Sequence, residues 1–226
     1  MLECRGAIRW VWRVLVAGLL LSACATESPS PSPTVGQEDA EAATVLFVED
    51  FSTARTTQWA LFDTDVGAAY IQRGELYLED RGANTAVYTP LLGQAWEDVR
   101  LHVRVRQVEG TFNNWMGVLC RQQDEENYYL FAISADGYYL LLRVVDGLAT
   151  PLAGPTASDA IEVGRATNVM VVTCQGDYLS MMVNDDYMVA RTDAELPGGG
   201  VALFVDAVEG RANTTVAFSR LEVYQP

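Results

Sequence analysis

Residues 99–147, VRLHVRVRQVEGTFNNWMGVLCRQQDEENYYLFAISADGYYLLLRVVDG, decide the fold, because they contain four consecutive segments with the composition of β-strands. In the first segment, valine and leucine alternate with arginine and histidine, which is typical of a strand with one buried face. The later segments are apolar on both faces, which indicates progress from the edge to the centre of one sheet. Asp136-Gly137 lies between two aromatic runs and predicts a two-residue type I′ hairpin, in which both central residues have positive φ.

Strand-like segments continue on both sides of this stretch, separated by glycine, aspartate and asparagine, and no amphipathic helix of convincing length interrupts them. Gly176-Asp177 and Asp185-Asp186 predict two more tight hairpins. So many strands in one sheet would leave an apolar face in water, so the sequence predicts an all-β, two-sheet antiparallel sandwich. The further segments are 45–48, 69–72, 75–78, 86–89, 168–175, 178–184, 187–191, 200–205 and 214–224.

The N-terminus has the features of an export signal: a basic start, an apolar run at 14–21 and then small residues. The apolar run is too short to span a membrane. Its end, Leu21-Ser22-Ala23-Cys24, resembles the lipobox of bacterial lipoproteins, which implies cleavage before Cys24 and a diacylglycerol on its thiol. An ordinary signal peptide and a buried N-terminal helix are the alternatives.

A segment rich in serine, proline and acidic residues follows and cannot bury enough apolar surface to fold. At ~5–6 Å times the square root of its length, it is a tether that holds a domain roughly 25 Å from the bilayer. We therefore expect a signal peptide at 1–23, the lipidated Cys24 and tether at 24–43, and the sandwich at 44–226. The expected location is the cell membrane, lipid-anchored and facing the extracytoplasmic side.

The net charge of the chain is −15, and it contains one histidine. Because such an acidic protein repels phosphates, nucleic acid is excluded as the main partner. The expected partners are the membrane, through the lipid anchor, and a glycan, and we expect a monomer.

Several quoted elements resemble the concanavalin A-like jelly rolls of the LamG-like and 3-keto-disaccharide hydrolase type. They are GVLCRQQDEENYYLFAISADGYYLLL at 117–142, GGVAL at 199–203, EDFS at 49–52 and Trp59. The resemblance covers residues 45–226 and implies the fold, whereas domains of this type include lectin-like modules, appendages of signalling proteins and hydrolases. The chain departs from the pattern at Phe218-Ser219, where the family often has Phe-Asp and the aspartate would supply a metal or polar contact.

Four cysteines are present, of which Cys4 leaves with the signal and Cys24 is expected to be acylated. The remaining pair, Cys120 and Cys174, lies on two predicted strands of an exported domain, where disulfides persist. We predict a disulfide between them with Cα atoms ~4.4–6.8 Å apart; the alternative is two separate buried thiols. With no Cys/His cluster, the sequence offers no zinc site.

Catalytic motifs are weak. Jelly-roll glucanases that resemble this fold carry Glu-x-Asp-x-(x)-Glu on one strand, since a retaining glycosidase needs two carboxylates ~5–5.5 Å apart. The nearest string here runs from Glu75 to Glu79 and has Tyr77 in place of the aspartate, so a solvated strand face is the simpler interpretation. His102 belongs to the arginine-alternating strand, which leaves no Ser-His-Asp set. Whether the chain is an enzyme stays open, with a non-catalytic role favoured.

A second constellation is aromatic and polar, and it fits a sugar platform, since aromatic rings stack on sugars and polar side chains bind hydroxyls. Cross-strand packing is the alternative, with one member of each Tyr-Tyr pair pointing into the sandwich. The arginine stripe of 100–106 should face the chain's own carboxylates, such as Asp124, Glu125 and Glu126, or an anionic ligand. The predicted ligand-binding residues are Asn114, Trp115, Arg104, Arg106, Arg121, Tyr128 and Tyr138.

No cofactor is required by these motifs, and calcium is the one metal that the sequence allows for, through oxygens of Glu49, Asp50, Asp185 and Asp186. The resulting hypothesis is a cell-surface lipoprotein with a non-catalytic, carbohydrate-binding jelly roll. The alternatives are a glycoside hydrolase of the 3-keto-disaccharide hydrolase type and a protein-interaction or sensory module.

Overall fold

The computed structural model describes residues 43–52, 57–82, 86–207 and 213–226. The expected signal peptide, the lipidated Cys24 and the tether up to residue 42 lie outside the described residues. The described part is built from β-strands and turns, and it holds no helix that could cross a membrane.

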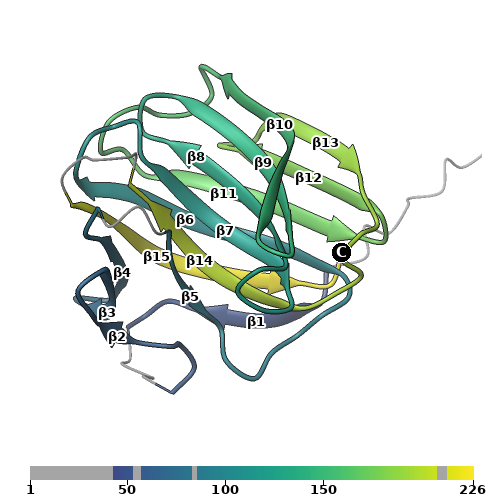
Figure 1. Cartoon of the computed structure of the whole chain (residues 1–226), viewed down its shortest axis with the longest axis horizontal. Helices are drawn as coiled ribbons and strands as arrows, with labels where there is room; N and C mark the ends of the chain where they lie inside the picture. The colour runs from purple at the N-terminus through teal and green to yellow at the C-terminus, as the bar shows by residue number, and fades with distance from the viewer. Residues whose placement is uncertain (1–42, 53–56, 83–85, 208–212) are drawn as a thin grey trace, which may run out of the picture. The chain divides into compact units, whose positions relative to one another are not determined.

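The strands form two antiparallel sheets, drawn in Figure 1. The nine-stranded sheet has the order β13 (Asp186–Thr192), β12 (Tyr178–Val183), β11 (Asn168–Gln175), β6 (Val99–Glu109), β15 (Thr214–Tyr224), β4 (Glu75–Asp80), β3 (Gly67–Gln72) and β2 (Phe62–Asp63), and β1 (Val45–Glu49) also pairs with β15. The six-stranded sheet has the order β10 (Leu148–Ala157), β9 (Tyr138–Val145), β8 (Tyr128–Ser134), β7 (Trp115–Gln122), β14 (Gly200–Asp206) and β5 (Val87–Pro90).

The predicted all-β sandwich is confirmed, and each predicted segment coincides with a strand to within a few residues. The prediction for 214–224 matches β15 at both ends. Two strands were not predicted, the two-residue β2 and the edge strand β10. β10 contains Pro151 and Pro155, which cannot donate to a ladder, and its pairing with β9 is interrupted by two register shifts. Such a strand carries no clear period for a sequence pattern to reveal.

The expectation that residues 99–147 progress across one sheet is wrong for their first strand. β6 lies in the nine-stranded sheet between β11 and β15, whereas β7, β8 and β9 are neighbours in the six-stranded sheet. Residues 110–114 therefore carry the chain from one layer to the other. The strict alternation of β6 arises because one face of the strand packs on the core and the other faces solvent. In a two-layer sandwich this is true of strands inside a sheet as well as of edge strands.

The hairpins also differ from the prediction in detail. At Asp136-Gly137 only Gly137 has positive φ (94°), and its N–H donates to the carbonyl of Ser134, so the turn is not type I′. The turn expected at Asp185-Asp186 is shifted by one residue. Asn184 and Asp185 have positive φ and connect paired residues of β12 and β13, as a type I′ turn requires.

The core lies between the two sheets and is formed by alternate residues of every major strand. The predicted disulfide is confirmed: Cys120 of β7 is bonded to Cys174 of β11, although their Cα atoms are 7.0 Å apart, just beyond the predicted range of ~4.4–6.8 Å. Because β7 and β11 belong to different sheets, this bond links the two layers covalently through the core.

Candidate functional site

The outer face of the six-stranded sheet is apolar, although it is not part of the core between the sheets. Large apolar residues of β7, β8, β9 and β14 occupy the positions that alternate with the core positions on each strand. We call this surface the six-stranded face. Its base consists of the buried residues Leu119, Leu130, Ala132, Leu140, Ala202 and Phe204, and Ala86, Tyr88, Trp115, Tyr128 and Leu142 are partly exposed around them.

Three aromatic side chains, Trp115, Tyr128 and Tyr88, are half-buried on this face. Burial, followed by the charge of Glu125, raises the pKa of Tyr88 to about 12. The pKa of Tyr128 is raised by burial and by the charge of Asp206. Neither hydroxyl forms a hydrogen bond with another described residue. The face therefore offers aromatic rings and two polar groups that are free for a ligand within the described chain.

A groove of about 800 Å³ runs beside β5 at the margin of the face. Tyr88 and Pro90 form one part of its wall, and the turn between β7 and β8 forms another. Its charged lining residues are Asp124 and Glu125, and its polar ones include Gln94, Gln122 and Gln123. The volume is in the range of small-molecule sites in proteins.

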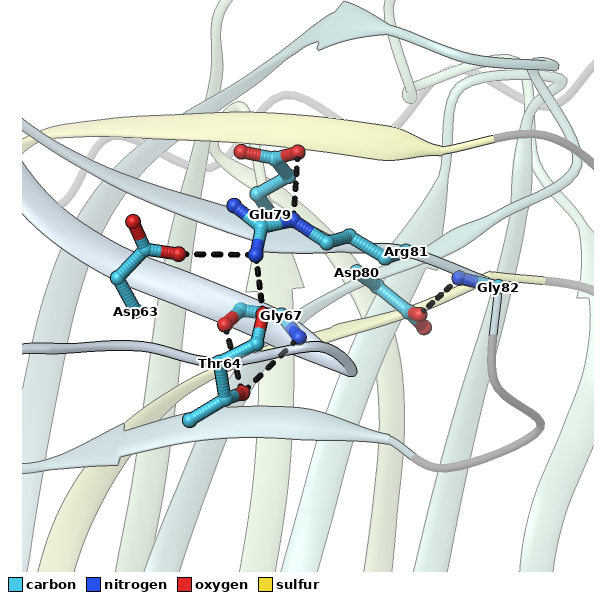
Figure 2. A network of polar contacts seen from close by, with 7 residues as sticks. All are labelled: Asp63, Thr64, Gly67, Glu79, Asp80, Arg81 and Gly82. Atoms are coloured by element: carbon cyan, nitrogen blue, oxygen red, sulfur yellow. Dashed lines mark hydrogen bonds and ion pairs between the residues drawn. The ribbon is translucent and has the colours of Figure 1, made fainter.

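The third part of the wall is the β2–β3 hairpin, which contributes Phe62 and Val66 and is held by the polar network in Figure 2. Arg81 donates to the carboxylates of Asp63 (2.8 Å) and Glu79 (3.2 Å) and to the carbonyl of Thr64. The Thr64 hydroxyl donates to the carbonyl of Gly67 (2.9 Å). These contacts fix a short hairpin that has few ladder hydrogen bonds of its own.

Asp206, the last residue of β14, pairs with Trp115 of β7 and brings a carboxyl group to the edge of the face. It is half-buried and forms no hydrogen bond with another described residue. Burial, followed by repulsion from Asp80, raises its pKa from 3.8 to about 6. Asp80 itself is buried and accepts hydrogen bonds from the backbone N–H groups of Gly82 and Ala207, both 2.7 Å long. Of the two carboxyls, Asp206 is therefore the one that lacks a hydrogen bond within the described residues.

The raised pKa of Asp206 predicts a pH-dependent effect of Asp206→Asn on stability. Between pH ~4 and ~6 the folded state binds a proton that the unfolded state has released, so this carboxyl makes the domain less stable as pH rises. At pH 7.5 the substitution should raise the free energy of unfolding by about 1–2 kcal/mol, and at pH 4 it should change it little. Denaturant titrations at both pH values measure this; an equal effect at both would contradict it.

The predicted ligand-binding residues lie in three places. Trp115 and Tyr128 are on the six-stranded face, and Tyr138, the first residue of β9, lies on the same side of the sheet by alternation with Leu140. Tyr129 and Tyr139, the other members of the two tyrosine pairs, pack with the core, as strand alternation requires.

Arg104 and Arg106 lie on the opposite surface of the molecule, the outer face of the nine-stranded sheet. Arg106 forms an ion pair with Glu75 (2.6 Å), and Arg104 is exposed and paired in register with Arg220. The expectation that Asp124, Glu125 and Glu126 face the arginine stripe is wrong, because they form the β7–β8 turn of the other sheet. The only acid bonded to the stripe in the described chain is Glu75.

The glucanase-like string falls on this same outer face. Glu75 is bound by Arg106 and by the hydroxyl of Tyr77 (2.8 Å), while Glu79 is bound by Arg81. Both carboxylates thus neutralise arginines on the surface of the nine-stranded sheet, as expected for a solvated strand face.

Asn114 and Arg121 are buried, each with 1% of its surface exposed. The amide of Asn114 donates to the carbonyl of Thr111 (2.6 Å) and to the hydroxyl of Thr214. Arg121 has positive φ next to a register shift between β7 and β14, which breaks the alternation and turns its side chain inward. Its guanidinium donates to the carbonyls of Glu97 (3.2 Å) and Leu196 (3.0 Å) and to the carboxylate of Asp98 (3.4 Å).

Tyr88, Phe204 and Asp206 are not among the site residues predicted from the sequence. Alternation marks AVYT (86–89) and ALFVD (202–206) as strands. In the second segment it places Phe204 and Asp206 on the same side of the strand, and in the first it places Tyr88 on the side opposite Val87. The pattern does not reveal that β14 pairs with β7 and that β5 pairs with β14, which brings these residues to Trp115.

The candidate calcium ligands do not gather into a site. Glu49 is buried and accepts from the N–H of Phe51 (2.8 Å), and Asp50 accepts from the hydroxyl of Ser52 (2.7 Å). Within the described ranges, no three His, Cys, Asp or Glu side chains lie close enough together to hold a metal ion.

Comparison with known proteins bears on the fold. No protein-family model and no curated protein sequence matches this chain. Among solved structures, it is similar to a carbohydrate-binding module of Bacillus subtilis, CBM66, with 15% identity over 72% of this chain and 92% of that chain (TM-score 0.57). It is also similar to a laminarinase of Flavobacterium sp. UMI-01, with 9% identity over 80% and 100% (TM-score 0.60), and to the catalytic domain of an endo-1,3-β-glucanase of Thermotoga petrophila, with 8% over 81% and 98% (TM-score 0.59). At these identities the similarity establishes the concanavalin A-like jelly-roll fold.

Proposed function

We propose that the six-stranded face binds a carbohydrate without cleaving it, and that a lipid anchor at Cys24 presents the domain on the extracytoplasmic side of the cell membrane. The observation that carries the proposal is the arrangement of Trp115, Tyr128 and Tyr88 on an apolar sheet surface beside a groove of about 800 Å³. The first part concerns the described domain, and the second depends on the N-terminal sequence.

The chemistry of the face suits a sugar. The apolar side of a pyranose ring packs on an aromatic ring, and sugar hydroxyls need partners at the rim. The hydroxyls of Tyr88 and Tyr128 and the side chains of Gln94 and Gln122 supply donors and acceptors without being used by other described residues, whereas the amide of Gln123 donates to the carbonyl of Gly198 (3.3 Å). Structural similarity to a carbohydrate-binding module and to glucanases supports the proposal at the level of the fold.

Binding is favoured over hydrolysis by the distribution of carboxylates. A retaining mechanism needs two of them ~5–5.5 Å apart across the scissile bond. On the strands of the six-stranded face, Asp206 is the only carboxylate that the described residues provide, and its near neighbour Asp80 is occupied by two backbone N–H groups. The acidic string of β4 lies on the other sheet and is held by arginines.

Replacing Trp115 by alanine is expected to reduce affinity for a soluble glucan at least tenfold. We expect the stacking of a sugar on one aromatic side chain to contribute as much as that of a nucleobase, which is on the order of 1–3 kcal/mol. Affinity electrophoresis against a panel of soluble polysaccharides, including the β-1,3-glucan laminarin, would measure the retardation of the wild-type chain and the variant. Tyr187→Ala is the matched control, since Tyr187 is an exposed aromatic (62%) on the nine-stranded sheet.

The panel also separates the alternatives. If no polysaccharide retards the wild-type protein, carbohydrate binding fails, and a protein-interaction or sensory module becomes the better account. If reducing sugar is released from laminarin or from a 3-keto-glycoside and Asp206→Asn abolishes the release, the domain is a hydrolase. Equal loss of affinity in the Trp115 and Tyr187 variants would contradict the assignment of the face.

A further inference from the structure

The two outer surfaces of the sandwich differ in charge. The arginines of β6 lie on the nine-stranded sheet, whereas the six strands of the other sheet contain two basic residues in total, Arg121 and Arg143. Arg121 is buried, and Arg143 binds the carboxylate of Asp193 (2.8 Å), which also accepts from the core residue Tyr129. Neither reaches the six-stranded face.

Among the described residues, the charged groups that lie at the face are therefore carboxylates. Asp206 stands at one margin beside Trp115, and Asp124 and Glu125 line the groove at the other. Burial, followed by the charge of Asp206, raises the pKa of Tyr128, which lies on β8, two strands from β14 in the sheet. Asp124 is fixed in place, because it accepts from the side chain of Asn127 (2.9 Å) and the N–H of Glu126 (2.8 Å).

A negative potential over a partly desolvated aromatic surface discriminates between sugars. A uronate or a sulfated sugar would lose hydration and meet like charges that no basic group of the described residues at the face offsets. A neutral sugar stacks without that penalty. A sugar with a free amine can also donate to a carboxylate and place its ammonium against the Trp115 ring, where cation–π attraction adds to the ion pair.

We propose that Asp206 is the specificity-determining residue of the six-stranded face, and that it makes this face prefer amine-bearing sugars to neutral ones and reject anionic ones. The inference rests on the proposed function, because it names the class of sugar that the same surface takes. Asp206 fits the role because it is half-buried and uncommitted among the described residues, so its charge is poorly screened and available to a ligand.

The test measures affinities of the full chain for three hexasaccharides of glucose, glucosamine and galacturonate by isothermal titration calorimetry. The chosen pH is 7, where a carboxyl with a pKa of about 6 is mostly ionised. We expect the glucosamine hexamer to bind most tightly and the galacturonate hexamer most weakly. In Asp206→Asn, the ratio of glucosamine to galacturonate affinity should fall about tenfold, because one ion pair in a partly buried site contributes on that order.

Asp177→Asn is the matched control, because it removes the same charge from an exposed turn of the nine-stranded sheet and should leave the ratio unchanged. Binding of the glucose hexamer with a ratio that Asp206→Asn does not alter would overturn the specificity role and leave the proposed function intact. An equal change in both variants would also overturn it, since net charge would then be the cause. If no hexamer binds to the wild-type chain, the proposed function fails, and this inference fails with it.

Discussion

Replacing Cys120 and Cys174 together by alanine is expected to lower the free energy of unfolding by about 4 kcal/mol, because the bond closes a loop of 54 residues in the unfolded chain. For a domain of this size that corresponds to a fall of about 8–16 °C in melting temperature. The bond joins β7 to β11 and therefore adds a covalent link to the packing and the polar contacts that hold the two layers together. Denaturant titration and calorimetry measure both quantities.

Reduced wild-type protein is the control for this double substitution, because it loses the bond and keeps the two sulfur atoms in the core. We expect reduction to account for most of the loss, and the alanine pair to add only the effect of two small cavities. Thiol labelling of denatured, unreduced protein should detect neither Cys120 nor Cys174. Two labelled thiols in exported protein, or a change below about 1 kcal/mol on reduction, would show that the bond does not stabilise the sandwich.

How far sequence predicts this structure depends on how local the signal is. β6 was predictable because valine and leucine alternate with polar residues from Val99 to Arg106, and the second half of β15 has the same alternation in residues 220–223. The same alternation divides Tyr128 from Tyr129, so that one lies on the six-stranded face and the other in the core. β10 escaped prediction because two prolines and two register shifts remove its period.

The candidate site is harder to predict, because its parts come from strands that are distant in sequence. Tyr88, Trp115, Tyr128 and Asp206 belong to β5, β7, β8 and β14, and only the order of the six-stranded sheet brings them together. Trp115 and Tyr128 could be proposed from composition alone. Tyr88 and Asp206 required the pairing of β14 between β7 and β5, which no short pattern encodes.

The prediction for the arginines was wrong for a different reason: it grouped three arginines at one site, although the fold separates them. Arg104, Arg106 and Arg121 were predicted as one polar set near a sugar. A register shift beside Arg121 turns it into the protein, whereas the regular alternation of β6 keeps Arg104 and Arg106 on the opposite surface. A one-residue irregularity of this kind reverses the direction of a side chain, and the residue types around it give no sign of it.

Arg121→Met is expected to lower the free energy of unfolding by about 2–4 kcal/mol, because it leaves the buried carbonyl of Leu196 and the carbonyl of Glu97 without their donor. Asp98 keeps one partner, since it also accepts from the N–H of Gly176 (2.7 Å). Lysine should rescue little, as a single ammonium cannot reproduce the fork that reaches three acceptors.

Arg104→Met is the matched control for this prediction, because Arg104 is exposed and forms no ion pair with another described residue. Its effect should lie within about 0.5 kcal/mol. Denaturant titration of both variants measures the difference, and glucan affinity measured well below the melting temperature separates support of the fold from contact with a ligand. If Arg121 acts only through the loops that hold Glu97 and Leu196, its loss weakens the fold while affinity per folded molecule is retained. A variant that stays fully stable and loses affinity would instead place Arg121 against the sugar, and the burial of its guanidinium would then have to change on binding.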